Sequence, residues 1–128
     1  NNMMKYSVNC ITMEIGNRPW GSYYVLEDTD FYKLKRIEVN IGGRLSYQYH
    51  NHRAEVWTIV QGKALVTLDG NDYEYKAGEV VIIPLQAKHR IQNIGDETLI
   101  FIEVQHGTYF GEEDIIRLED DYNRSSED

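Results

Sequence analysis

Short runs of strand-forming residues separated by turn residues dominate this chain, and they restrict its fold more than any other feature. The runs are rich in Tyr, Leu, Ile and Val or alternate apolar with polar residues; they cover residues 31–40, 45–50, 56–60, 64–68, 72–76, 79–83, 90–92 and 99–105. The dipeptide Asp69-Gly70 between two of them is a strong hairpin signal. About eight strands at this spacing predict an all-β sandwich or barrel. Helical periodicity is nearly absent, and we expect one short helical turn within residues 111–122.

Length, charge and cysteine content narrow the class of protein. A chain of 128 residues has the length of one domain. Its net charge of −8 and its longest basic group, Lys33, Lys35 and Arg36, argue against a nucleic-acid partner. No apolar run reaches the roughly 18 residues that a membrane span needs. The only cysteine, Cys10, cannot form an internal disulfide, which favours a reducing, cytoplasmic setting.

Four potential metal ligands have a spacing that brings them together. Gln48 and His50 lie two residues apart on one predicted strand, so their side chains point to the same face. Glu55 opens the next strand and returns to the same place, and His89 enters from a later strand. Two imidazoles, one carboxylate and one neutral oxygen suit Zn²⁺, with Mn²⁺, Co²⁺, Ni²⁺ and Fe²⁺ as alternatives. We therefore predict one divalent metal ion, and zinc first.

The spacing around these residues resembles the two motifs of the cupin superfamily. Those motifs read Gly, five residues, His-x-His, three or four residues, Glu, six residues, Gly, and then Gly, five residues, Pro-x-Gly, two residues, His, three residues, Asn. The matching positions here are Gly42, Gln48, His50, Glu55 and Gly62, and then Gly78, Pro84, Gln86, His89 and Asn93. Gln48 replaces the first His and Gln86 the loop Gly. A register on His50 and His52 would leave only two residues before Glu55, and His106 lies outside both motifs.

Further segments resemble one group of cupins, the type II mannose-6-phosphate isomerase domain. They include Arg-Pro-Trp-Gly-Ser-Tyr at residues 18–23 and His-Arg-Ala-Glu at residues 52–55. The resemblance covers residues 17–124 as a cupin domain and leaves an N-terminal extension, 1–16, and a disordered tail, 125–128. It implies a jelly-roll barrel of the double-stranded β-helix type. This domain often forms the C-terminal part of bifunctional mannose-1-phosphate guanylyltransferase/isomerase proteins, but no Gly-rich nucleotide-binding stretch occurs here.

The implied reaction interconverts mannose 6-phosphate and fructose 6-phosphate through a cis-enediol. Besides the metal, it requires a group that moves a proton between C2 and C1, and the candidates are Glu103, Lys35 and His52. It also requires cations for the phosphate of the hexose substrate. For that role the sequence offers Arg18, Arg44, Arg53, Arg90 and Arg117, of which we choose Arg53, Arg90 and Arg18.

Two other functions remain open at this level. One is a cupin that binds metal and sugar without turnover, and the other is a metal-dependent cupin dioxygenase. Gln48 argues weakly against the dioxygenase, because a neutral oxygen ligand suits a Lewis acid. The outer faces of such barrels are often apolar and pair with a second copy, so we also expect a homodimer.

Overall fold

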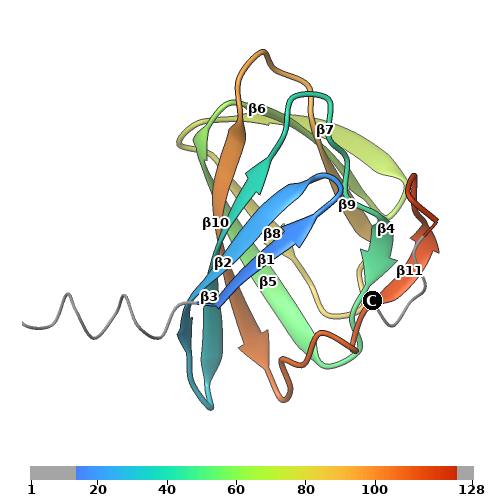
Figure 1. Cartoon of the computed structure of the whole chain (residues 1–128). Coiled ribbons are helices and arrows are strands. Elements are labelled where there is room, and N and C mark those ends of the chain that lie inside the picture. The colour runs from blue at the N-terminus through green and yellow to red at the C-terminus, as the bar shows by residue number, and fades with distance from the viewer. Residues whose placement is uncertain (1–13, 124–128) are drawn as a thin grey trace, which may run out of the picture.

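Two antiparallel sheets form the structure in residues 14–123, the part of the chain that the computed structural model describes (Figure 1). The larger sheet has six strands in the order β1 (Glu14–Arg18), β2 (Gly21–Asp28), β3 (Tyr32–Val39), β10 (Leu99–Gly107), β5 (Arg53–Gln61) and β8 (Val80–Ile83). The smaller has five strands in the order β11 (Ile116–Glu119), β4 (Tyr47–Tyr49), β9 (His89–Asn93), β6 (Lys63–Leu68) and β7 (Asn71–Lys76). Cys10 and the tail 125–128 lie outside the described residues.

The sequence predicted most of these strands and missed three. Each of the eight predicted runs corresponds to a strand, from β3 to β10. Strands β1, β2 and β11 were not predicted, because polar residues and glycines weaken their alternation. The helical turn predicted within residues 111–122 is wrong, since this segment forms a turn and then β11. The first strand begins at Glu14 and so crosses the expected start of the domain at residue 17.

Alternation along three adjacent strands builds the core. In β3, β5 and β10 every second residue is buried and points between the two sheets. The strand register sets Ile37, Phe101 and Ile59 side by side across the larger sheet. The smaller sheet faces them with residues such as Val66 and Ile91. This half of the interior is an ordinary apolar core.

The same inward face becomes polar toward the other end of the three strands. Lys35 pairs with Glu103, and Lys33 with Gln105, which in turn pairs with Glu55. All five side chains are buried, although their residue types are rarely found in protein interiors without partners. A concentration of buried polar groups at one end of a barrel is the expected position of a functional site.

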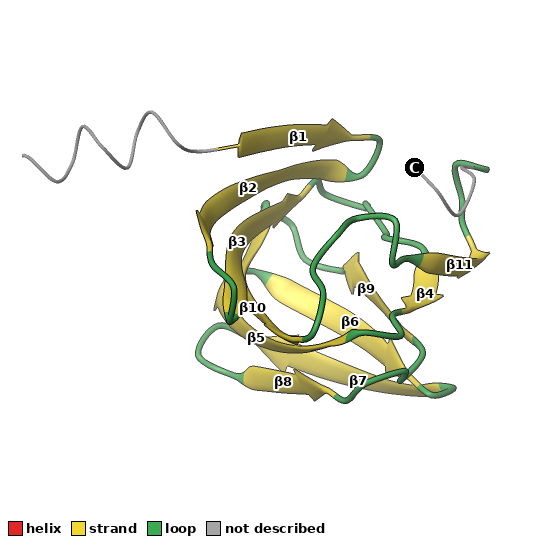
Figure 2. Cartoon of the chain, turned by 90° about the horizontal axis from the view of Figure 1, so that it is seen from below, coloured by secondary structure: helices red, strands yellow, loops and turns green. Residues whose placement is uncertain are grey.

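The connections between strands differ in length. The predicted hairpin at Asp69-Gly70 joins β6 to β7, and both residues have positive φ (47° and 86°), as a two-residue primed turn requires. In contrast, the connection from β10 to β11 runs across the polar end of the barrel (Figure 2). The described residues contain no helix long and apolar enough to cross a membrane.

Candidate metal centre and active site

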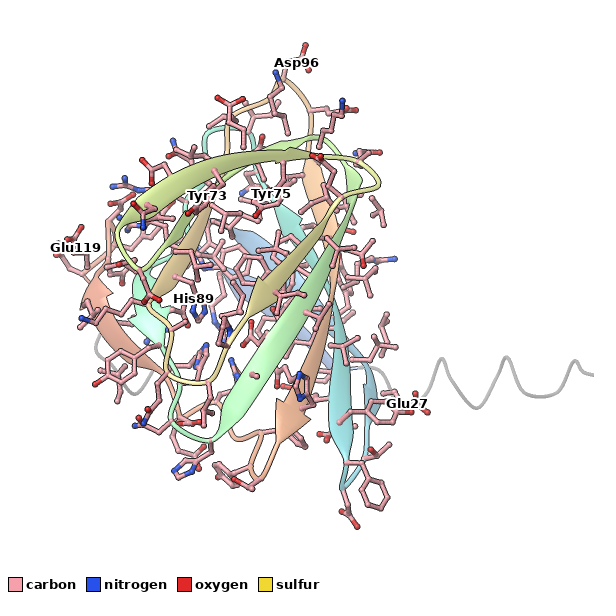
Figure 3. All side chains as sticks on the ribbon, turned by 180° about the vertical axis from the view of Figure 1, so that it is seen from behind. Glu27, Tyr73, Tyr75, His89, Asp96 and Glu119 are labelled. Atoms are coloured by element: carbon pink, nitrogen blue, oxygen red, sulfur yellow. The ribbon has the colours of Figure 1, made fainter. Side chains whose placement is uncertain are left out.

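Three predicted ligands meet between the sheets at the polar end. His50 follows β4, Glu55 lies in β5 and His89 begins β9. Each offers a ligand atom within 4.8 Å of the other two, and all three residues are buried. The His50 Nε2 atom lies 3.2 Å from Glu55 Oε2, and the two imidazole centroids lie 5.0 Å apart. Figure 3 shows His89 inside the barrel, whereas Glu27, Asp96 and Glu119 lie at its periphery.

Backbone carbonyl groups orient both imidazoles. His50 donates from Nδ1 to the Asp114 oxygen at 2.7 Å, and His89 donates from Nδ1 to the Ala87 oxygen at 2.8 Å. A carbonyl oxygen can only accept, so the proton of each neutral ring is on Nδ1 and the lone pair is on Nε2, which in His50 lies 3.4 Å from Arg53 Nη2. This arrangement of the second ring nitrogen is typical of metal-ligating histidines. The rings are therefore set to bind a metal through Nε2.

The protonation states of the three groups also suit a metal. Burial lowers the pKa of His50 to about 4, and burial likewise lowers the pKa of His89, so both rings are neutral at pH 7. Burial alone would raise the pKa of Glu55, but the charge of Arg53, the two imidazoles and the hydrogen bond from Trp57 together outweigh burial and lower it. Two neutral imidazoles and an ionised carboxylate are the forms that ligate divalent ions.

Gln48 lies beside this triad. Its register partner across β4 and β9 is His89, and its side chain lines the same cavity. The Gln48 Nε2 atom donates to Ser46 Oγ at 3.0 Å, which leaves the amide oxygen as the atom offered for coordination. The residue types and positions thus fit the predicted set of three charged or imidazole ligands and one neutral oxygen.

A carboxyl group with a raised pKa lies next to the triad. Glu103 of β10 faces the cavity, where Gln105 donates from Nε2 to its Oε2 at 2.6 Å. Burial raises the pKa of Glu103 to about 7, and the negative charge of Glu55 contributes to this rise. A carboxyl group that titrates near neutral pH can both accept and release a proton. The structure thus places Glu103, one of the three predicted base candidates, in the cavity together with the triad.

Cations also lie close to Glu55 and Glu103. Arg53 donates from Nε to Glu55 Oε2 at 2.9 Å, while Trp57 donates from Nε1 to Glu55 Oε1 at 2.8 Å. Lys35 is 4% exposed and lies 2.7 Å from the carboxylate of Glu112. All of these side chains line a cavity with an empty space of about 640 Å³, including its opening to solvent. The cations therefore line the same cavity as the three metal-ligand candidates and Glu103.

Comparison with known proteins identifies the family of this site. The family model described as mannose-6-phosphate isomerase C-terminal matches residues 6–120. The chain belongs to this family. It is 46% identical over 110 residues to alginate biosynthesis protein AlgA from Pseudomonas aeruginosa, and 45% identical over 107 residues to mannose-1-phosphate guanylyltransferase from Escherichia coli K12. These matches cover 86% and 84% of the chain but only 23% and 22% of the two relatives.

Solved structures confirm the predicted cupin fold of this family member. The cupin domain of Cnp3 from Schizosaccharomyces pombe superposes with a TM-score of 0.65 at 22% identity, over 67% of this chain and 60% of that one. A likeness at this identity shows the fold alone. The isomerase family and the cupin barrel, both predicted from sequence, are thus confirmed.

Not every residue predicted from the family resemblance lies in the cavity. His52 is exposed and packs edge-on against Tyr109, with 6.3 Å between ring centroids. Arg90 lines the cavity, but its guanidinium donates to the Leu45 and Glu119 carbonyl oxygens. Arg18 lies at the end of β1 and lines the same cavity, with its guanidinium 5.0 Å from the ring centroid of Tyr23. The structure thus brings Glu103, Lys35 and Arg53 together with the triad, and leaves His52 outside.

Sequence reasoning missed three contributors to the site. Lys33 shares the strand parity of Lys35, and this signal could have revealed it. Glu112 and Asp114 lie in the irregular connection from β10 to β11, where no periodicity predicts the direction of a side chain. Asp114 accepts hydrogen bonds from the backbone amides of Asn51 and His52 at 3.0 and 2.9 Å, in addition to the bond from His50.

Proposed function

We propose that this domain is a metal-dependent aldose–ketose isomerase that interconverts mannose 6-phosphate and fructose 6-phosphate. The observation that carries the proposal is a single buried cavity in which three metal-ligand candidates, a carboxyl group with a pKa near 7 and several cations lie together. Membership of the mannose-6-phosphate isomerase C-terminal family supports the same reaction. Each of the three requirements of the reaction therefore has named residues.

His50, Glu55, His89 and Gln48 would hold the divalent ion. We propose zinc first, because imidazole and carboxylate ligands suit it, with Mn²⁺, Co²⁺, Ni²⁺ and Fe²⁺ as alternatives. When bound, such an ion polarises carbonyl and hydroxyl oxygens of the open-chain sugar. The chain's own contribution is orientation, since Asp114 and Ala87 fix both rings through their carbonyl oxygens.

Glu103 is our candidate for the group that moves the proton. As a carboxylate it removes the proton from C2 of the aldose, which gives the cis-enediolate, and as the resulting acid it returns that proton to C1. The proton of the C2 hydroxyl group passes to the oxygen on C1, so that C1 becomes the alcohol and C2 the carbonyl of the ketose. The hydrogen bond from Gln105 holds one carboxyl oxygen during both steps. Lys35, its register partner, supplies a positive charge that favours the carboxylate form.

The test is conversion of mannose 6-phosphate to fructose 6-phosphate by the purified chain. We expect turnover that chelation abolishes and that added Zn²⁺, Mn²⁺ or Co²⁺ restores. Bound metal without turnover would favour the non-catalytic sugar-binding cupin. Consumption of dioxygen by the iron-loaded protein would instead favour the dioxygenase.

We further propose that the domain forms a homodimer through the outer face of the larger sheet. Three apolar side chains at one edge of this face are exposed, namely Val60 (48%), Val80 (49%) and Ile82 (66%). The edge strand β8 also presents unpaired backbone groups that a second copy can cover. Sedimentation should show a dimer that Ile82→Lys converts to a monomer, and a monomeric wild type would contradict this.

We also propose a cytoplasmic location, because a chain with a single cysteine needs no oxidising compartment to fold. Fractionation of cells that produce the protein should recover it with cytoplasmic markers.

A further inference from the structure

Three buried cations converge on one oxygen atom of Glu112. Its Oε2 lies 2.7 Å from Lys35 Nζ, 3.5 Å from Lys33 Nζ and 4.0 Å from Arg53 Nη1. The side chains of the three cations are between 4% and 9% exposed, whereas that of Glu112 is 31% exposed. The positive charges are therefore part of the barrel interior, and the negative charge reaches them from the solvent side.

Arg53 has a donor that the protein leaves without a hydrogen bond. Its Nε donates to Glu55 and its Nη2 lies 3.4 Å from His50 Nε2, so two of its nitrogens serve the metal-ligand candidates. The third, Nη1, is buried and has no hydrogen-bond partner. A buried guanidinium donor without a partner is costly, and it indicates that an acceptor oxygen is missing from this position.

Glu112 belongs to a connection whose two ends are hydrogen-bonded to the barrel, and whose middle is held by one bond, from Lys33 Nζ to the Phe110 carbonyl oxygen at 3.4 Å. The backbone amide of Thr108 donates to the His52 oxygen at 2.9 Å, and the Asp114 carboxylate accepts from the backbone amides of Asn51 and His52. Between these points, the side chain of Glu112 is held by the cations alone among the described contacts. Its carboxylate can therefore leave without breaking the ladder of any strand.

We propose that Lys33, Lys35 and Arg53 form a subsite for a phosphomonoester dianion, and that the carboxylate of Glu112 occupies this subsite until the ligand displaces it. Naming a sugar phosphate as the ligand rests on the proposed function. A phosphate dianion offers three acceptor oxygens and one more negative charge than a carboxylate, so it can satisfy Arg53 Nη1 as well as both lysines. Burial alone would raise the pKa of Glu112, but the cations lower it to about 2, so the internal competitor is ionised at every working pH.

The test measures binding of inorganic phosphate to the metal-loaded protein by calorimetry. Glu112→Gln removes the competing charge and should lower the dissociation constant on the order of tenfold, since the subsite is then no longer occupied by the chain itself. Glu113→Gln is the matched control, because it makes the same charge change one residue away, where the carboxylate contacts Tyr109 instead. Glu113→Gln should leave the phosphate affinity within about twofold of the wild type, a much smaller change than the one expected when the competing carboxylate of Glu112 is removed.

A second substitution in the Glu112→Gln background tests the cations themselves. Lys35→Gln should remove the gain in phosphate affinity, and Lys33→Gln is the substitute if the first double variant does not fold. A Glu112→Gln variant that binds phosphate no better than Glu113→Gln would overturn the inference. The same holds if the double variant keeps the gain, or if the gain disappears after chelation, because the phosphate then binds the ion.

Separate ligands and a separate turnover assay distinguish this inference from the proposed function. Mannose 6-phosphate should show the same gain as inorganic phosphate in Glu112→Gln, and unphosphorylated mannose should show none. A gain for mannose as well would also overturn the subsite. If the protein turns over mannose 6-phosphate but Glu112→Gln does not change phosphate binding, the subsite is wrong and the isomerase proposal stands. If Glu112→Gln increases phosphate binding as expected but there is no turnover, the subsite stands and the isomerase proposal is wrong.

Discussion

The two ends of the barrel interior are built from the same strands and have opposite character. At one end Ile37, Phe101 and Ile59 lie side by side on the inward face. Two residues further along each strand, on the same face, the neighbouring residues are Lys35, Glu103 and Trp57. The apolar end gains free energy from burial, while the polar end must offset the loss of hydration of every charged group. The difference shows that β3, β5 and β10 serve stability in one half and chemistry in the other.

The largest effect is expected from Glu103→Gln at the polar end. Removing the proton-transfer group should lower kcat by about 10²–10⁴-fold. Metal content should stay near that of the wild type, and so should the urea midpoint at pH 4.5, where Glu103 is protonated in the folded protein, because glutamine keeps the shape and the bond to Gln105. Kinetics with metal analysis will check this, and unchanged kcat would remove Glu103 from the mechanism.

The same residue gives a pH prediction for the metal-free protein. Because the pKa of Glu103 is raised from 4.5 to about 7 in the folded state, the folded chain keeps a proton that the unfolded chain releases. This contribution to stability is complete below pH 4.5 and is lost as the pH rises toward 7, by at most about 1.4 kcal/mol per pH unit. Urea denaturation across this range should show a slope that Glu103→Gln removes, and equal slopes would contradict the raised pKa.

Phe101→Ala tests the apolar end. The side chain is 0% exposed, so its removal should lower the free energy of unfolding by about 3–5 kcal/mol through lost burial and the cavity left behind. Folded protein should still bind one divalent ion, because Phe101 packs against Trp57 within the apolar core and offers no ligand atom. Denaturation and metal titration will measure the two effects, and loss of metal binding in the folded variant would break the separation of the two ends.

His89→Ala should have the reverse pattern. Loss of an imidazole ligand should weaken metal binding at least about 100-fold, beyond the usual effect of altering an outer partner of a ligand. The stability of the metal-free protein should change far less than in Phe101→Ala. Full metal retention would remove His89 from the ligand set.

The smallest effect is expected from Lys33→Met. This change removes a buried ammonium group, while Lys35 and Arg53 still pair with Glu112, so stability should change by less than about 1.5 kcal/mol. Urea denaturation will measure it. A larger loss of stability would mean that Lys33 stabilises the fold, as the buried side chains of the apolar end do.

Periodicity and motif spacing predicted the fold and the centre of the site. Parity placed Glu103 on the face of Phe101 and Gln105, and the structure buries all three. Spacing brought His50, Glu55 and His89 together because strand geometry converts sequence separation into position. The prediction is weaker where the backbone is irregular, as at Glu112, since side-chain direction there depends on contacts made after folding. His52 shows the same limit, because the strand that would have turned it inward ends at Tyr49.

Asp114 lies two residues from Glu112, and this closeness has a thermodynamic consequence. One short stretch of backbone carries both the carboxylate that fills the cation cluster and the carbonyl oxygen that orients His50. Any ligand that displaces Glu112 thus acts on the same piece of chain as an ion that fixes His50. Binding of two ligands that share such an element is thermodynamically coupled. If the first ligand changes the affinity of the second by some factor, the second changes the affinity of the first by the same factor.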